Sequence, residues 1–389
     1  MNKESIEKIK KYPYKDGVIS IIGASITIIV GLLTLLTCIY ESDIIINNKL
    51  YIYFVSIVLI IYGLLWLWIG FKAINSNREL NKKLGGMAYK FDYKKELKKY
   101  KYDEKKISIV DAREVITNDE APVRAVRSKK DSSIVKGINM VKSGEGDIFI
   151  SAGSTGALLS GGLFILGRIQ GIDRPALASV YPIIGGRASL LVDAGANSEC
   201  KPNNLLEFGI MGNIYMEKVI GRENPKVGLV NIGSESKKGS TLTKAAYELL
   251  EQSDMNFIGN VEARDVPKGA CDVIVTDGFT GNVILKLTEG LAWNILQVIK
   301  KKFTEGVKAK LGAALLIDKL GSLKQEFDYS SYGGAPILGV KGPILKMHGS
   351  SSANAVKNTI LKGIPYVEGN VVGTIQNSVL EIEEITLNE

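Results

Sequence analysis

The chain has 389 residues, 46% of them hydrophobic, and a formal net charge of +8. This length allows two or three domains, and 41 glycines at this hydrophobic content are typical of an α/β protein rather than a disordered chain. Most of the excess positive charge lies between Lys72 and Lys106, directly after an apolar segment, so it indicates membrane topology rather than nucleic-acid binding. One histidine and three scattered cysteines argue against a Ser-His-Asp hydrolase, a histidine-ligated metal site and a disulfide framework.

Residues 1–73 are predicted to form a transmembrane hairpin with spans at about 17–40 and 50–71. Each span is an uncharged run long enough to cross a hydrocarbon core of ~30 Å as a helix. Lysines crowd both outer flanks, and the positive-inside rule then predicts a two-span protein of the cell membrane with both termini and the catalytic domain in the cytoplasm. Residues 74–106 follow as a basic juxtamembrane connector.

Residues 107–389 are predicted to form one α/β domain. Its strand-like runs are Ile107–Val110, Ile148–Ile150, Ala176–Val180, Ser189–Val192, Val227–Asn231, Phe257–Gly259 and Val273–Val275. Helical patterns such as Leu205–Ile220 and Thr241–Gln252 lie between them. This alternation predicts a mostly parallel sheet that binds ligands at the carboxyl ends of its strands. The segment at about 285–327 is predicted as helices 287–311 and 313–323, which form a core or dimer pair with an apolar, lipid-contacting tip at 311–317.

A turn of small residues, Ser151 to Ala157, joins a strand-like run to a helix-like run. Small residues let the backbone approach a ligand, and a helix start offers free N–H groups to an anion. The candidate phosphate ligands are Ser151, Gly153, Ser154, Thr155 and Gly156. The turn lacks the Gly-Lys-Ser/Thr ending of a P-loop and the dinucleotide fingerprint, and a tight turn of small packing residues is the alternative interpretation.

Further polar loops follow the predicted strands. The loop from Asp193 to Pro202 holds an acid, an amide and a cation, so Lys201 is a candidate to bind phosphate and Asn197 to donate to an oxyanion. A polar loop with an Asx-turn is the alternative, and Cys200 is expected to be buried rather than nucleophilic. The other candidates at loop positions are Asn231, Asn260, Asp277, Gly278, Asn282, His348 and Ser350. Amide-rich strand ends without a metal cluster or an activated nucleophile indicate a transferase for anionic substrates that needs no metal and no cofactor.

Ten short motifs occur here in the order found in the PlsX family of bacterial phosphate acyltransferases, which the sequence resembles over about residues 107–379. They are residues 127–133, 151–157, 193–197, 200–202, 231–233, 259–262, 277–279, 281–282, 332–336 and 348–351. The resemblance implies a three-layer, mostly parallel sheet like those of isopropylmalate dehydrogenases and phosphotransacetylases. It also implies a homodimer and contact with membrane lipid.

The resemblance implies transfer of a fatty acyl group from acyl carrier protein to inorganic phosphate. The acyl phosphate then serves a downstream acyltransferase that acylates glycerol 3-phosphate in phospholipid synthesis. We expect Ser151, Ser154, Thr155 and Gly156 to bind phosphate. Lys201, Asn197 and Asp193 are the expected catalytic residues. Asn231, Asn260, Asp277 and Asn282 are expected to orient the thioester arm.

The family's N-terminal motif Asp-Ala-Met-Gly-Gly-Asp does not occur in this sequence, and the predicted hairpin and connector stand in its place. Several readings therefore stay open beside an active, anchored enzyme. One is an inactive, anchored relative that binds a partner, and another is a broken gene joined to a membrane segment. Another alternative is a phosphotransacylase whose acyl donor is acyl-CoA. The remaining one is a dehydrogenase on the same fold, which a requirement for NAD(P)H or a metal would favour.

Overall fold

The computed structural model describes residue 64 and residues 96–185, 187–316 and 333–388. The chain divides into two compact units, 1–110 and 111–389, and each is described by itself. In the first unit the 3-10 helix η1 (Glu104–Lys106) is capped by the carboxylate of Asp103, which accepts from the backbone N–H of Lys105. Ile107–Val110, predicted as a strand, is irregular and leaves Ile107 and Val110 exposed. The domain boundaries predicted at 73 and 106 stay predictions.

The second unit contains a five-stranded sheet in the order β3-β4-β7-β5-β6. Its strands are β3 (Ser179–Pro182), β4 (Ala188–Val192), β5 (Val227–Asn231), β6 (Phe257–Glu262) and β7 (Val273–Val275). Strands β4, β7, β5 and β6 are parallel, and β3 pairs antiparallel with β4. The sequence predicted β5 and β7 with their observed bounds, because both are short apolar runs that begin and end at polar or glycine-rich positions.

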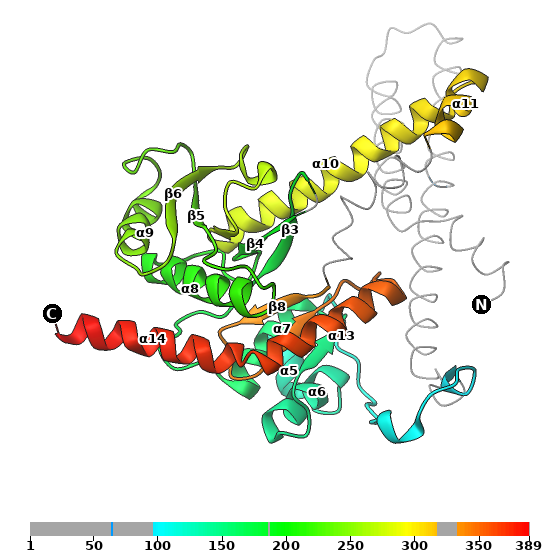
Figure 1. Cartoon of the computed structure of the whole chain (residues 1–389). Coiled ribbons are helices and arrows are strands. Elements are labelled where there is room, and N and C mark those ends of the chain that lie inside the picture. Colours follow the sequence, from blue (N-terminus) through cyan, green and yellow to red (C-terminus); the bar gives the residue numbers. More distant parts are fainter. Residues whose placement is uncertain (1–63, 65–95, 186, 317–332, 389) are drawn as a thin grey trace, which may run out of the picture. The chain divides into compact units, whose positions relative to one another are not determined.

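Helices cover both faces of this sheet. Because side chains alternate along a strand, Leu190 and Val192 pack into one core with α8 (Pro202–Lys218) and α9 (Thr241–Glu251). Leu191 points to the opposite face. There it packs into a second core, which includes residues of η3 (Val266–Lys268) and the first turns of α10 (Gly278–Thr304). Figure 1 shows α8 and α10 on either side of β4. This part of the unit is therefore three-layered.

A second, four-stranded sheet has the order β1-β9-β8-β2. Its strands are β1 (Phe149–Ser151), β2 (Ala176–Leu177), β8 (Ala335–Leu338) and β9 (Ile344–Lys346). Only β1 and β9 are parallel, and the other pairs are antiparallel. Four short helical elements share a core with this sheet: α5 (Pro122–Ser128), α6 (Ser133–Ser143), α7 (Thr155–Gly161) and the π-helix η2 (Gly162–Leu166).

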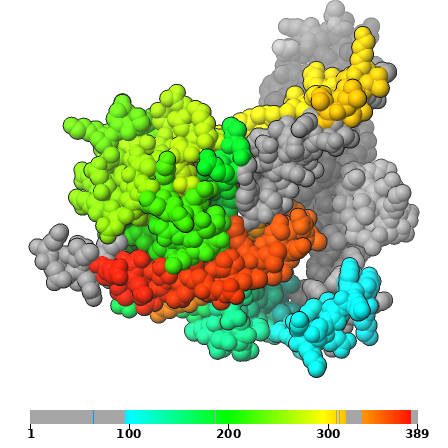
Figure 2. Space-filling model, in the orientation of Figure 1, coloured from blue at the N-terminus to red at the C-terminus, as the bar shows by residue number. Residues whose placement is uncertain are grey.

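Three more helices complete the described part of the unit: α11 (Val307–Leu315), α13 (Ala353–Glu368) and α14 (Val371–Asn388). Helices α13 and α14 lie against α8, and their orange to red surface borders the green surface of α8 in Figure 2. Within this packing the rings of Tyr215 on α8 and Tyr366 on α13 meet edge to face, with centroids 5.6 Å apart.

The prediction of an α/β fold is confirmed at the level of a mixed fold with parallel strands. The finer prediction of one three-layer, mostly parallel sheet differs from the two sheets observed. The difference arises at β8 and β9, because Gly339 adopts a positive φ of 85° close after β8 and the chain returns as an antiparallel strand.

The predicted membrane localisation requires a correction. Among the residues that the structure describes, no helix is long and apolar enough to cross a membrane. Helix α10 has the length, at 27 residues, but Lys286 and Glu289 interrupt its apolar stretch. The two predicted spans, 17–40 and 50–71, lie outside the described residues apart from Leu64. We therefore withdraw the prediction of a two-span membrane protein.

Candidate active site

The loop after β4 is built around the carboxylate of Asp193, which is fully buried. It accepts hydrogen bonds from the backbone N–H groups of Leu177, Gly195, Ala196 and Asn197, at 2.7–3.1 Å, and from the side-chain amide of Asn197 at 2.9 Å. Burial raises the pKa of Asp193, while these hydrogen bonds act in the opposite direction. The carboxylate thus shapes the loop and has no exposed edge for a substrate.

Asn197 is also occupied by protein contacts. Its side-chain Nδ2 donates to the backbone oxygen of Pro175 at 2.8 Å and to Asp193 at 2.9 Å. Its own backbone oxygen accepts from Gly278 N–H at 2.7 Å. Both N–H bonds of the amide are therefore used, and the geometry does not favour the predicted role of Asn197 as an oxyanion donor.

The start of α10 completes this first cluster of predicted residues. Asp277 caps the helix by accepting from the backbone N–H and the hydroxyl of Thr280, at 2.9 and 2.7 Å. A Cβ at Gly278 would lie 2.5 Å from the backbone oxygen of Asn197, and one at Gly195 would lie 3.4 Å from Asn282. The structure thus brings together the loop after β4 and residues 277–282.

Lys201 lies at the N-cap of α8 with its side chain exposed, beside two arginines that the sequence analysis missed. Three cations, Arg168, Arg174 and Lys201, surround one acid, Asp173, and we name them the cation cluster. The hydrogen bond from Asn204 lowers the pKa of Asp173 most, and the positive charges of the cation cluster lower it further. Glu207 of α8 also contacts this segment, so three cations face two carboxyl groups, and the excess positive charge favours an anionic ligand.

Glu207, from the second turn of α8, fixes the backbone at Arg174. Its Oε2 accepts from the N–H of Asp173 at 3.0 Å and from that of Arg174 at 3.3 Å. Asn204 adds a bond of 3.1 Å to the carboxylate of Asp173. The signal in the sequence was a pair of arginines bracketing an acid just before a strand. Only the folded chain reveals that α8 holds this segment beside Lys201.

Burial raises the pKa of Glu207 from 4.5 to about 7. Between these values the folded protein holds a proton that the unfolded chain has lost, so the free energy of unfolding falls as the pH rises through this window. We expect Glu207→Gln to remove this contribution, at most ~3 kcal/mol, while its amide oxygen still accepts from Asp173 and Arg174. Urea unfolding of the wild type and of Glu207→Gln at about pH 5 and about pH 8 measures this pH-dependent contribution to the free energy of unfolding. If the free energy of unfolding changes equally between the two pH values in the wild type and in Glu207→Gln, Glu207 is not the group responsible.

The glycine-rich turn after β1 forms a second cluster. The backbone oxygen of Ser151 accepts from Met347 N–H at 2.8 Å, and its hydroxyl accepts from Gly153 N–H at 3.1 Å. The hydroxyl of Ser154 caps α7 at 3.4 Å from the N–H of Ala157. Thr155 and Gly156 are the first residues of that helix. Two of the predicted phosphate-binding hydroxyls therefore already accept bonds from the turn itself.

His348 and Ser350 follow β9 and belong to this second cluster. The ring Nδ1 of His348 lies 2.7 Å from the hydroxyl of Ser350 and accepts from its backbone N–H at 3.2 Å. Both residues are exposed. A Cβ at Gly349 would lie 3.8 Å from the backbone oxygen of Ala152, which brings this loop beside the glycine-rich turn.

Asn231, the last residue of β5, and Asn260, which lies within β6 rather than in a loop, form a third cluster. The amide of Asn231 donates to the backbone oxygen of Lys238 and to Asn260 Oδ1, both at 3.0 Å. The amide of Asn260 donates to the backbone oxygen of Glu235 at 2.8 Å. These bonds hold the loop of residues 232–240, so both amides serve the loop rather than an open ligand site.

Cys200 is a neutral thiol, because burial raises its pKa to about 11. It lies in the loop before Lys201, and its Sγ is 3.5 Å from the backbone oxygen of Asn197. The expectation that Cys200 is no nucleophile agrees with this pKa.

Comparison with known proteins supports one assignment. The family model described as "Fatty acid synthesis protein" matches residues 71–373. The chain is 55% identical over 284 residues to the phosphate acyltransferase of Alkaliphilus oremlandii, covering 73% of this chain and 84% of that protein. It is 49% identical over 316 residues to that of Clostridioides difficile, covering 81% and 93%.

Among solved structures, the EutD phosphotransacetylase from Staphylococcus aureus is similar with a TM-score of 0.41 at 17% identity, over 66% of this chain and 78% of that chain. The resemblance inferred from the ordered motifs is confirmed by the family model and by the identity to the relatives. The chain belongs to the PlsX family of phosphate acyltransferases.

Proposed function

We propose that this acyltransferase moves a fatty acyl group from the thioester of an acyl carrier protein to inorganic phosphate, which yields an acyl phosphate and the free carrier protein. The named relatives support the reaction class. The observation that carries the proposal is the cation cluster, in which Lys201 and Arg174 are exposed and the three cations outnumber the two neighbouring acids, Asp173 and Glu207. A phosphate dianion and the oxyanion of an attacked thioester both need such positive charge.

The reaction needs no nucleophilic side chain. A phosphate oxygen forms a bond to the thioester carbon, and negative charge gathers on the carbonyl oxygen. When the tetrahedral intermediate collapses, the C–S bond breaks and the thiolate of the carrier protein takes a proton from water. We assign Lys201 to the oxyanion and Arg174 to the phosphate, because both are exposed cations of one cluster.

Asp193, Asn197 and Asp277 are proposed to position the loop rather than to touch the reacting atoms. Their polar atoms are used in bonds within the loop and the helix cap. Binding of phosphate by the glycine-rich turn, and of the thioester arm by the third cluster, stay predictions.

The proposed function is tested with the purified full-length chain, acyl carrier protein thioester and phosphate. Hydroxylamine traps an acyl phosphate as a hydroxamate, and we expect hydroxamate only when phosphate is present. Acyl-CoA in place of the carrier thioester separates this reaction from that of a CoA-dependent phosphotransacylase. A folded protein that gives no phosphate-dependent hydroxamate with either donor would overturn the proposal.

A second copy of the chain is the proposed partner of α10. Val283, Leu287, Leu291 and Val298 repeat at four- and seven-residue spacing along this helix, and all are exposed, Leu287 by 66%. Sedimentation is expected to give a dimer that Leu287→Asp together with Leu291→Asp splits, and a monomeric wild type would contradict it. Lipid contact at residues 311–317 and a complex with the downstream acyltransferase stay predictions.

A further inference from the structure

Helix α5 presents an exposed face on which basic and apolar residues alternate. Ala121, Val123, Arg124, Arg127 and Ser128 line a shallow concavity of about 490 Å³. The guanidinium of Arg127 lies 5.1 Å from the ring centroid of Phe164, a contact that restrains the long side chain. The motif at residues 127–133 belongs to this region, and the roles assigned above leave it unused.

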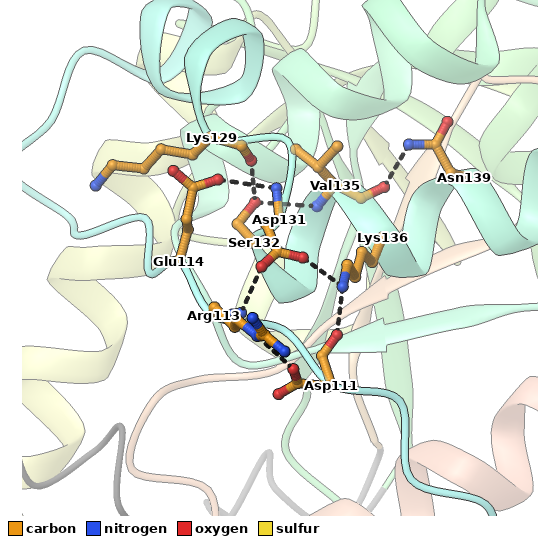
Figure 3. Close-up of polar contacts among 9 residues, drawn as sticks. All are labelled: Asp111, Arg113, Glu114, Lys129, Asp131, Ser132, Val135, Lys136 and Asn139. Atoms are coloured by element: carbon orange, nitrogen blue, oxygen red, sulfur yellow. Dashed lines mark hydrogen bonds and ion pairs between the residues drawn. The ribbon is translucent and has the colours of Figure 1, made fainter.

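Two of the acidic residues around α5 are already paired with lysines, whereas the exposed Asp119 is in no ion pair among the described residues. Glu120, just before the helix, pairs with Lys129, just after it, at 2.7 Å. This bond and two from Thr117 lower the pKa of Glu120 to about 2. Figure 3 shows the neighbouring network, in which Asp131 pairs with Lys136 and also accepts from the N–H of Arg113.

The cations on the exposed face are not neutralised in this way. Within the described residues no ion pair includes Arg124, Arg127 or Lys130, and all three are exposed. The Glu120–Lys129 ion pair thus joins the segments at the two ends of α5, while Arg124 and Arg127 remain exposed on the helix and Lys130 is exposed just beyond it. A rigid, positive face with apolar residues between the charges fits an acidic protein surface.

This face borders the glycine-rich turn. A Cβ at Gly156 would lie 2.6 Å from Cγ of Pro122, the first residue of α5. A protein seated on α5 would therefore lie beside residues 151–157, at the end of β1. No other acidic macromolecule takes part in the proposed reaction, and this reasoning rests on that proposed function.

We infer that the exposed α5 residues Val123, Arg124 and Arg127, with Lys130 just beyond the helix, form the docking surface for the acidic acyl carrier protein that donates the acyl group. Charge complementarity selects this occupant. Positive residues at the rim of an interface act mainly on association, so binding should weaken as salt rises.

The test measures binding of purified holo-acyl carrier protein from Clostridioides difficile, the source of a 49%-identical relative, to the full-length chain by titration calorimetry. We expect Arg124→Glu and Arg127→Glu each to raise the Kd about tenfold. Lys244→Glu, an equal charge reversal at an exposed position of α9, is the matched control and should leave the Kd within about twofold. Circular dichroism verifies that each variant is folded.

Unchanged binding in both arginine variants, or an equal loss in Lys244→Glu, would overturn the docking surface. The docking surface would also be overturned if the arginine variants still bind the carrier protein but no longer bind anionic vesicles or no longer self-associate. Hydroxamate formation separates the two proposals. If the carrier protein binds through α5 but no acyl phosphate forms, docking stands and the proposed function fails. If acyl phosphate forms and the arginine variants keep the wild-type KM for the carrier thioester, docking fails alone.

Discussion

Gly281→Ala is expected to lower the free energy of unfolding by about 3 kcal/mol, the largest stability effect that the site offers. A Cβ at this position would lie 1.9 Å from the backbone oxygen of Asp193 and 2.9 Å from Cγ2 of Thr276. The backbone here cannot move freely, because Asp193 N–H donates to the backbone oxygen of Thr276 at 3.0 Å directly after the paired strands β4 and β7. The helix would have to move away from the loop.

Gly290→Ala is the matched control in the same helix. Apart from the neighbouring backbone of α10 itself, no atom of the described residues lies within 4 Å of its Cβ position, so the substitution should stabilise the protein by ~0.5–1 kcal/mol through helix propensity. Chemical denaturation followed by circular dichroism measures both variants. If Gly281→Ala stabilises the protein as Gly290→Ala does, α10 does not begin against the loop of Asp193.

Lys201→Ala is expected to lower kcat/KM for acyl phosphate formation about 100-fold, with little change in stability. Loss of one charged or hydrogen-bonding group that stabilises an oxyanion typically has an effect of this size. The side chain is exposed, and the N-cap geometry depends on the backbone of Lys201, so the fold does not need the ammonium group.

Lys244→Ala removes an exposed lysine from α9 and serves as the control for net charge. Its activity should stay within about twofold of the wild type, since distant surface charges are screened by salt. Activity within twofold in Lys201→Ala itself would rule out its proposed role. Lys201→Arg should retain part of the activity, because it keeps the charge with a different geometry.

The regular part of the fold could be predicted where apolar runs were bounded by clear turn residues. Strands β5 and β7 and helix α9 follow the sequence pattern closely. Strands β8 and β9 escaped the pattern because β8 contains Pro336, and Gly342 and Pro343 directly precede β9. The run Ile107–Val110 has a strand-like composition but pairs with no described strand.

The sequence proposes candidate site residues, but it cannot show which of their polar groups are already used in contacts within the protein. A sequence can place Asn197 and Asn231 at strand ends, yet it cannot tell that Pro175 and Lys238 accept their amide hydrogens. The same limit hid Arg174, whose position depends on Glu207, 33 residues further along the chain. Composition identifies the chemistry of a loop, whereas tertiary contacts decide which groups remain available to a ligand.

The most direct test of the account follows phosphate itself. Isotopically labelled inorganic phosphate is incubated with the wild-type chain and a long-chain acyl carrier thioester, and both the organic-extractable label and the released thiol are measured. The account predicts that label and thiol appear in equal amounts and that both disappear together in Lys201→Ala. Thiol release without extractable label would mean that water, not phosphate, accepts the acyl group, and would contradict the proposed reaction.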